Sequence, residues 1–420
     1  MDRYEELAAR HGTPLYVYDL DELDAARRDL FDALPDGFTL FYALKANPHP
    51  GLVRALREGD GRGCRPEISS TGELEAALTA GFRGEDCLYT GPGKTAGELA
   101  EAVALGVRLF STDSVTDVQH VADAARAHGV TADCLLRVNS VTASATSSIR
   151  MTGTPSQFGF DSETLPELMP RLREIEGVRL SGMHFFPLSN AKDEADLVGE
   201  FRHTIELAAE LQRQLNLPLR FLDIGGGFTV PYAVPGARGS YPKLRGELEA
   251  ALDTHFPRWR TEGPEIACES GRYLVGSSGT LVARVSNVKT SRGRTFVILD
   301  AGINTFGGMS GLGRLLPVAV GTESGETAQR ASLVGPLCTP GDILGREIDL
   351  PALEPGDTVR IPNAGAYGPT ASLLMFLGRP APVEVIVRGD DVLSVSRIEH
   401  RRAYRTEDTA PSADAPGAAG

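Results

Sequence analysis

The sequence predicts an α/β protein made of a (β/α)8 barrel and a mostly antiparallel C-terminal β domain. From about residue 38 to 275, short apolar runs alternate with amphipathic helical periods, and beyond 276 strand-like runs with frequent turn residues replace them. Repeated βα units imply a parallel sheet. A barrel is favoured over a doubly wound sheet, because about eight strands are counted and no dinucleotide-type glycine turn lies near the start.

The expected elements follow this division along the chain. Residues 13–23 alternate Leu15 and Val17 with Tyr16 and Tyr18, which predicts a half-buried strand leading into a helix. Barrel strands are expected in 38–46, 87–91, 107–113, 133–140, 178–186, 219–228 and 265–270. Strands of the β domain are expected in 279–290, 294–302, 357–365, 382–389 and 392–398.

Composition and charge exclude several classes of partner. The 420 residues hold 42 Lys+Arg and 56 Asp+Glu, a net charge of −14, which disfavours binding to nucleic acid or anionic membrane. The polar N-terminus lacks the apolar stretch of a signal peptide, so a cytoplasmic location is expected. No disulfide framework or metal site is predicted, because no CxxC or close pair occurs among Cys64, Cys87, Cys134, Cys268 and Cys338.

Lys45 is the first candidate for chemistry. It follows the apolar run FYAL and precedes Ala-Asn-Pro, so it should lie at the mouth of the barrel, where strands end. Desolvation there would lower its pKa and make a Schiff base feasible. A solvated loop lysine is the alternative.

Two further strand ends carry groups suited to a cofactor. In GGGF (225–228), three glycines let backbone N–H groups point together at a phosphate, although a bare glycine turn is the alternative. In ESGRY (269–273), Glu269 could bond a protonated ring nitrogen and Arg272 could pair with phosphate. An ordinary surface Glu–Arg pair is the competing interpretation.

The β domain adds two segments. GPLCTPGD (335–342) places Cys338 in a loop punctuated by Gly and Pro, and GAYG (365–368) presents Tyr367 between small residues. Alone, each has an ordinary interpretation as a packing cysteine or a turn tyrosine.

Together and in this order, YALKAN, GGGF, E-x-GR, GPxC and GAYG resemble the fold-type III pyridoxal-phosphate decarboxylases. This family includes diaminopimelate, ornithine and arginine-type decarboxylases, and its barrel is related to that of alanine racemase. The resemblance covers about residues 13–400 and implies pyridoxal 5'-phosphate (PLP) as cofactor. It also implies an N-terminal segment (1–29) joining the β domain, a barrel over 30–275, a β domain over 276–405 and a disordered tail over 406–420.

The resemblance also implies roles for individual residues. Lys45 would form the Schiff base with the cofactor, Glu269 would hold the proton on the pyridine nitrogen, and Cys338 would reach the site of the other subunit of a homodimer as a proton donor. Because related racemases place an arginine at the ring nitrogen, Glu269 favours decarboxylation. The further cofactor-binding residues implied are Glu67, Glu73, Arg137, Ser189, Gly226, Gly227, Gly271, Arg272 and Tyr367.

Three departures from the family pattern narrow the substrate. In HFFPLSN (184–190), His184 stays at the first position of the usual HxHIGSQ, and Phe186 replaces the histidine that stacks on the ring. Thr339 replaces an acid after the cysteine, which argues against a substrate with a cationic far end. FLG (376–378) replaces the common FNG.

The variants GPLCTP, MTGTPSQFG and GAYGPTASLLMFL resemble a branch of antibiotic and other secondary metabolism. There the amino acid is carried as a thioester on an acyl-carrier protein, so the expected substrate is a glutamyl- or aspartyl-type group. Arg150, Arg314 and Thr339 are the expected substrate contacts. A free diamino acid (diaminopimelate, lysine or ornithine), racemisation, and a non-catalytic PLP-binding protein remain alternatives.

Carrier proteins are acidic, so the net charge of −14 opposes docking unless basic residues cluster. The segment SRIEHRRAYR (396–405) offers such a cluster in Arg397, Arg401, Arg402 and Arg405. A solvated face is the alternative interpretation of this segment.

Overall fold

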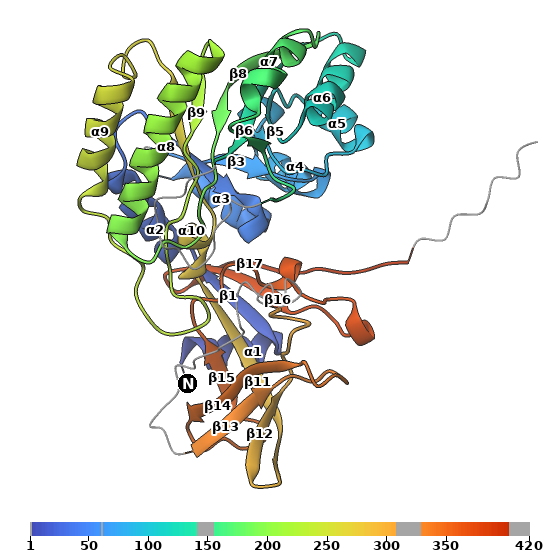
Figure 1. Cartoon of the computed structure of the whole chain (residues 1–420). Helices are drawn as coiled ribbons and strands as arrows, with labels where there is room; N and C mark the ends of the chain where they lie inside the picture. Colours follow the sequence, from blue (N-terminus) through green and yellow to red (C-terminus); the bar gives the residue numbers. More distant parts are fainter. Residues whose placement is uncertain (1, 60–61, 141–154, 308–328, 403–420) are drawn as a thin grey trace, which may run out of the picture.

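The structure, a computed structural model, describes residues 2–59, 62–140, 155–307 and 329–402. A barrel surrounded by helices lies above a second domain built on a β-sheet (Figure 1). The expected fold class is confirmed: the barrel is closed and parallel, and the second sheet is mostly antiparallel.

Eight parallel strands close the barrel. Pairing runs from the first strand to the last, and contacts between the last and the first complete the ring. The strands are β2 (Thr39–Ala43), β3 (Arg65–Ile68), β4 (Leu88–Tyr89), β5 (Leu109–Thr112), β6 (Ala132–Asn139), β8 (Val178–His184), β9 (Phe221–Asp223) and β10 (Glu265–Ser270), and the short β7 (Phe160–Asp161) pairs with the end of β6.

A helix follows each barrel strand, and the longer helices lie around the outside of the barrel (Figure 1). Several helices begin at a polar side chain that accepts a backbone N–H of the first turn, as Ser70, Thr95 and Ser114 do. The helices are α3 (Pro50–Glu58), α4 (Thr71–Thr79), α5 (Ala96–Ala104), α6 (Val115–Ala127), α7 (Leu165–Arg173), α8 (Glu194–Leu215), α9 (Leu244–His255) and the short α10 (Arg272–Gly276), with α2 (Leu20–Ala33) preceding β2.

The second domain joins the two ends of the chain. Its strands run in the order β14, β13, β12, β11, β1, β16, β17, and β15 also pairs with β11. Their bounds are β1 (Leu15–Asp19), β11 (Gly279–Ser291), β12 (Arg294–Leu299), β13 (Gln329–Val334), β14 (Ile343–Leu350), β15 (Thr358–Ile361), β16 (Val383–Arg388) and β17 (Asp391–Arg397); α1 (Arg3–His11) precedes β1.

The prediction that residues 13–23 form a half-buried strand is wrong in one respect. β1 lies in the middle of its sheet and is buried on both faces. Leu15 and Val17 pack beneath α1, whereas Tyr16 and Tyr18 belong to the main core. The two tyrosines tolerate burial because Tyr16 Oη donates to Thr305 O (2.9 Å) and Tyr18 Oη to Glu384 Oε1 (3.0 Å).

Four of the described strands were not predicted from the sequence. β3 reads RPEI and therefore shows neither an apolar run nor alternation, and the two-residue β7, β13 and β14 also lie outside the predicted runs. Of the helices that the structure describes, none is long and apolar enough to cross a membrane.

Candidate active site

The carboxyl ends of the barrel strands surround a pocket that opens toward the β domain. It is lined by most of the residues expected to bind a cofactor: Lys45, Phe186, Ser189, Gly226, Gly227, Glu269, Gly271, Arg272 and Tyr367, together with Ala43, Asn190, Phe228 and Ser270. A wider hollow beside α2 shares no lining residue with it and contains paired ions, such as Arg238 with Asp29 (2.8 Å). The gathering of strand-end groups therefore assigns the candidate site to the Lys45 pocket.

Lys45 lies two residues after the end of β2, in a single 3-10 turn, and points toward acidic groups. Its Nζ lies 3.5 Å from Glu67 Oε1 and 5.1 Å from the ring centroid of Phe186. Burial lowers the pKa of Lys45, but the carboxylates of Glu67 and Glu269 outweigh it and raise the pKa above its usual value. The expectation of a lowered pKa is wrong for two reasons. Desolvation is incomplete, because 43% of the Lys45 side chain is exposed, and the two carboxylates stabilise the charged amine.

Glu67 and Glu73 lie behind Lys45 rather than on the pocket wall. Glu67 Oε1 accepts the hydroxyl of Thr90 (2.7 Å), and its other oxygen is buried with no hydrogen-bond partner among the described residues. Glu73 lies in the first turn of α4 and accepts the N–H of Ser69 (2.7 Å). Burial, with a contribution from Glu67, raises the pKa of Glu73 to about 7.

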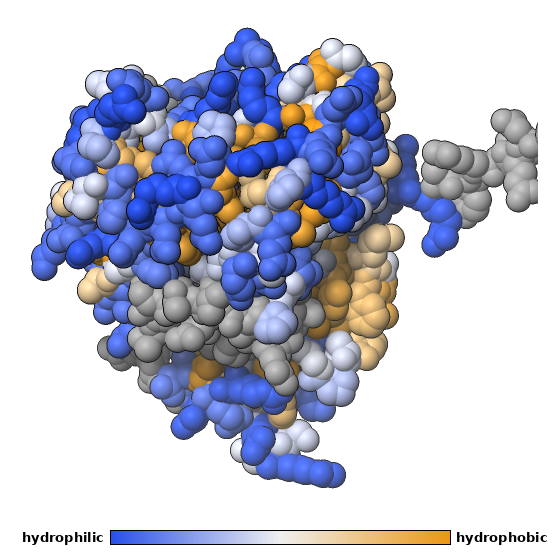
Figure 2. Space-filling view, turned by 45° about the horizontal axis from the view of Figure 1, so that its top comes forward, coloured by the Kyte–Doolittle hydropathy of each residue, from blue (hydrophilic) through white to orange (hydrophobic). Residues whose placement is uncertain are grey.

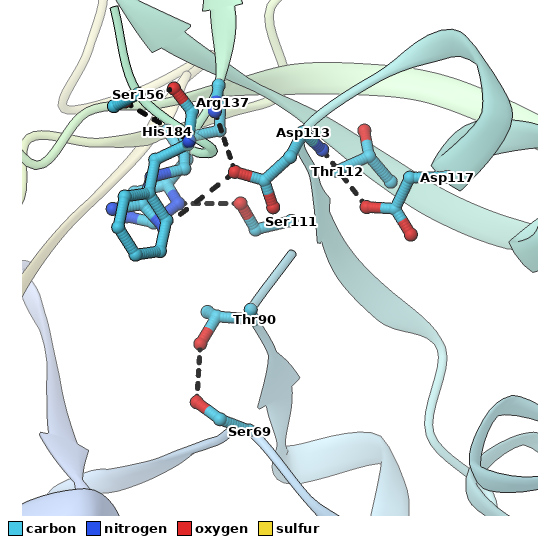
Figure 3. A network of polar contacts seen from close by, with 12 residues as sticks. Ser69, Thr90, Ser111, Thr112, Asp113, Asp117, Arg137, Ser156 and His184 are labelled. Carbon is cyan, nitrogen blue, oxygen red and sulfur yellow. Dashed lines mark hydrogen bonds and ion pairs between the residues drawn. The ribbon is translucent and has the colours of Figure 1, made fainter. Parts of the chain in front are cut away.

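A buried polar chain stands behind Glu269. Ser111 Oγ lies 2.6 Å from His184 Nδ1, and His184 Nε2 lies 3.0 Å from Glu269 Oε1. Figure 3 shows Ser111 pointing at the His184 ring. His184 was expected among the residues that bind the cofactor, but it supports Glu269 instead of lining the pocket.

Asp223, at the end of β9, joins this chain and was not singled out from the sequence, although it is the one acid in LRFLDI. One carboxylate oxygen of Asp223 lies within 4.8 Å of a ring nitrogen of His184 and of a carboxylate oxygen of Glu269. Burial, and then the charge of Glu269, raise the pKa of Asp223 well above its usual value. Burial also opposes ionisation of Glu269, but His184 and Lys45 prevail and lower its pKa. Of the two carboxyls, Glu269 is therefore the stronger acid.

Arg137, on β6, is held between aromatic rings and an acid. Its guanidinium carbon lies 4.6 Å from the ring centroid of Phe158 and 6.0 Å from that of Phe186. Its Nη1 lies 3.9 Å from Asp113 Oδ1, a contact drawn in Figure 3. Asp113 is supported in turn by the buried Lys94 (3.8 Å), a residue that the sequence analysis did not single out.

The glycine turn after β9 and Arg272 form a cradle for an anion. A Cβ on Gly226 would lie 2.5 Å from Glu269 O, so only glycine fits there, and Gly227 has φ +128°. Among the described residues, the amides of both glycines have no hydrogen-bond acceptor. Arg272 is 9% exposed, lies over the rings of Tyr367 (5.3 Å) and Tyr232 (5.7 Å), and has no ion-pair partner within the described ranges.

These observations fit the group expected from the sequence. A buried, unpaired guanidinium beside free amides suits a phosphate. A buried carboxylate deeper in the pocket suits a protonated ring nitrogen, and an amine beside it suits an aldehyde. The residues present therefore match the phosphate, ring and carbonyl of PLP.

Tyr367 connects the β domain to the mouth of the barrel. Its N–H donates to Ala46 O (2.7 Å), and Asn47 Nδ2 donates to Gly365 O (2.9 Å). The two residues after Lys45 are thus fixed by the GAYG turn, so the β domain helps to hold the lysine in place.

The remaining predicted residues have different outcomes. Cys338 is exposed, whereas the other four cysteines are buried, and it is not among the residues that line the Lys45 pocket. Thr339, beside it, is half-buried. Arg150 and Arg314 lie outside the described residues.

Comparison with known proteins defines the class. The family "Pyridoxal-dependent decarboxylase, pyridoxal binding domain" matches residues 20–276. The chain belongs to this family of decarboxylases, and it is a PLP-dependent carboxy-lyase with the fold-type III barrel.

Individual relatives cover nearly the whole chain. An L-glutamyl-[BtrI acyl-carrier protein] decarboxylase of Niallia circulans is 31% identical over 91% of this chain and 90% of its own. A diaminopimelate decarboxylase of Deinococcus radiodurans is 34% identical over 92% and 93%. The solved structure of diaminopimelate decarboxylase from Helicobacter pylori complexed with L-lysine superposes with a TM-score of 0.79 at 27% identity, over 94% and 95%.

Proposed function

We propose that this decarboxylase removes the α-carboxylate from an acidic aminoacyl group, glutamyl or aspartyl, that is carried as a thioester on an acyl-carrier protein. The proposal depends mainly on one observation: the loop that carries Cys338 presents no free carboxylate for a cationic substrate end. Thr339 follows the cysteine, and the only acid in residues 335–342 is Asp342.

The carboxylate of Asp342 is already used inside the protein. Its Oδ1 accepts the N–H of Ile303 (2.8 Å), its Oδ2 accepts the N–H of Leu337 (2.7 Å), and the residue is 3% exposed. It also packs so closely on Gly302 and Gly335 that a Cβ on either would collide with it. A distal ammonium group at this loop would therefore be left without a counter-charge, which is costly once it is desolvated.

The relatives support the same substrate without deciding it. One of them is described as a glutamyl-carrier-protein decarboxylase, while diaminopimelate decarboxylases of comparable identity cover the chain equally well. The carrier-bound glutamyl substrate is favoured because Thr339 stands in place of an acid and because Asp342 already accepts two backbone N–H groups. A free diamino acid is the second candidate, favoured by those diaminopimelate relatives.

Each residue of the pocket has a proposed task. PLP, when bound, accepts the electron pair that remains on Cα after CO2 leaves. Lys45 would hold the cofactor covalently, Glu269 would keep a proton on the ring nitrogen, and Phe186 would stack on the ring. The amides of Gly226 and Gly227, with Ser189, Gly271, Arg272 and Tyr367, would bind its phosphate.

Cys338 would return the proton to Cα, and it would do so in a second copy of the chain. This part of the proposal is supported by the exposure of Cys338 and by its absence from the residues around Lys45. Among the described residues, the pocket of one copy thus lacks Cys338, and a homodimer with shared sites would complete both pockets.

The test is release of CO2 from a panel of substrates. The panel contains glutamyl- and aspartyl-loaded carrier protein, free glutamate and aspartate, and free diaminopimelate, lysine and ornithine. We expect kcat/KM to be at least about tenfold higher for a loaded carrier than for any free diamino acid, because a buried unpaired ammonium costs more than 1.4 kcal/mol. Efficient turnover of a free diamino acid would refute the substrate assignment, and exchange of the Cα proton without CO2 release would indicate racemisation.

A further inference from the structure

A groove on the β domain lies beside the loop of Cys338. One wall is the segment from Met375 to Arg379, and the other is the end of β17 with the residues after it; Arg397, Ile398, Glu399 and Arg401 line this second wall. Arg379 Nη2 donates to Pro336 O (3.3 Å), two residues before Cys338. A direct contact therefore joins the groove to the loop that carries the proposed proton donor.

The groove is basic although the protein is acidic. Arg379, Arg397 and Arg401 are exposed, and among the described residues none of them takes part in an ion pair. Glu399 is the one acid on its walls. A local excess of positive charge on a chain of net charge −14 attracts an acidic partner that the rest of the surface repels.

The rim of the groove is apolar. Met375 is 71% exposed and Leu377 51%, and Leu373 and Phe376 of the same segment are also exposed. Figure 2 shows a patch of hydrophobic surface at the right-hand side of the molecule. Exposed apolar side chains next to unpaired arginines are typical of protein interfaces, because Met, Phe and Arg are more frequent there than on the rest of a protein surface.

We propose that this groove docks the acyl-carrier protein, with Arg379, Arg397 and Arg401 pairing with acidic side chains of the carrier. The inference rests on the proposed function and names the surface that serves it. Docking here would deliver a thioester-bound amino acid next to Cys338, and hence to the mouth of the pocket that Cys338 completes.

The experiment compares two substrates that differ only in the docking partner. One is glutamate on the BtrI acyl-carrier protein, and the other is the same glutamyl thioester on pantetheine alone. A triple variant (Arg379→Glu, Arg397→Glu, Arg401→Glu) is set against a control with the same change of charge on exposed arginines elsewhere in the domain (Arg292→Glu, Arg294→Glu, Arg346→Glu). We expect the first variant to lose about tenfold or more in kcat/KM on the carrier substrate, mainly through KM, and to keep its activity on pantetheine.

Other outcomes would overturn the inference. An equal loss on both substrates, an equal loss in the control, or a changed molar mass in light scattering would assign the groove to folding, to overall charge or to contact between copies. If the unmodified enzyme ignores both thioesters, the proposed substrate fails. Docking is then judged by fluorescence anisotropy of labelled carrier protein, where binding that does not depend on the three arginines would refute it.

Discussion

The mouth of the barrel and the loop of Cys338 are built in opposite ways. At the barrel mouth the polar side chains are buried at strand ends: Glu67 and Glu269 are each 2% exposed and His184 is 1% exposed. Cys338 is exposed on a turn that backbone hydrogen bonds to Asp342 hold in place. One chain therefore prepares the cofactor half of the site and leaves the half that selects the substrate at its surface.

The two regions therefore determine different properties of the enzyme, the chemistry of the reaction and the choice of substrate. The buried groups set the electrostatics of the reaction, which is common to the family. The exposed loop and its neighbours set what can approach, so they are the part in which substrate choice can change without disturbing cofactor binding.

The largest expected effect is at the barrel mouth. Replacing Lys45 (Lys45→Ala) should reduce CO2 release by roughly 10³-fold or more, because the amine that would hold the cofactor is lost. The visible absorbance of the bound cofactor should change at the same time. Lys289→Ala, at an exposed position of β11, is the matched control and should leave both unchanged.

Cys338→Ala should lower kcat by roughly 10²- to 10⁴-fold, the usual effect of removing a positioned proton donor. It should leave cofactor absorbance intact, since the residue does not line the pocket. Mixing it with Lys45→Ala under conditions of subunit exchange should restore about a quarter of the wild-type activity, because half of the dimers then hold one complete site. No recovery, with exchange verified, would mean that the sites are not shared.

Two neighbouring acids among the buried polar residues behind the pocket should respond differently to neutralisation. Glu269→Gln should reduce kcat by about 10²-fold, because the ring nitrogen would lose its anionic partner. Asp223→Asn should stay within about threefold of wild type, since burial and the charge of Glu269 raise the pKa of Asp223 and favour its neutral form, which the amide resembles. Difference infrared spectra at neutral pH should contain the band of a protonated carboxyl that Asp223→Asn removes, and a large loss of activity in that variant would show that Asp223 acts as an anion.

The smallest effect concerns stability rather than turnover. Burial raises the pKa of Glu384 from 4.5 to about 7, so between these values the folded state binds more protons than the unfolded state. Stability should therefore fall as pH rises from 4.5 to 7, by up to about 3 kcal/mol from this residue. In denaturant titrations, Glu384→Gln should reduce the fall in the free energy of unfolding between pH 4.5 and 7. Part of the fall should remain, because the pKa of Glu73 is also about 7. An unchanged slope would contradict the assignment.

The sequence predicted the architecture well, because the alternation of strands and helices is a local pattern. Strand ends and glycine turns offered Lys45, Gly226, Glu269 and Arg272 as candidates, each with an ordinary alternative, and the resemblance of the ordered motifs to the decarboxylase family favoured the cofactor roles. Asp223 and Lys94 could not be found in that way, because their importance comes from what other strands bring beside them. The raised pKa of Lys45 has the same origin, since Glu67 and Glu269 reach it from two other strands.

The substrate was harder to predict for a related reason. A threonine in place of an acid was visible in the sequence, but the commitment of Asp342 to the N–H groups of Ile303 and Leu337 was not. A carboxylate near a catalytic residue counts toward substrate binding only if the protein has left it free.

The position of β1 has a consequence for synthesis. Leu15–Asp19 is translated first and pairs in parallel with Val383–Arg388, which is among the last strands translated. The barrel can therefore form on the ribosome while β1 still lacks its neighbour, and the second sheet closes only near the end of translation. A fragment that begins after the barrel would lack the central strand of its own sheet, so the β domain should not be obtainable by simple truncation.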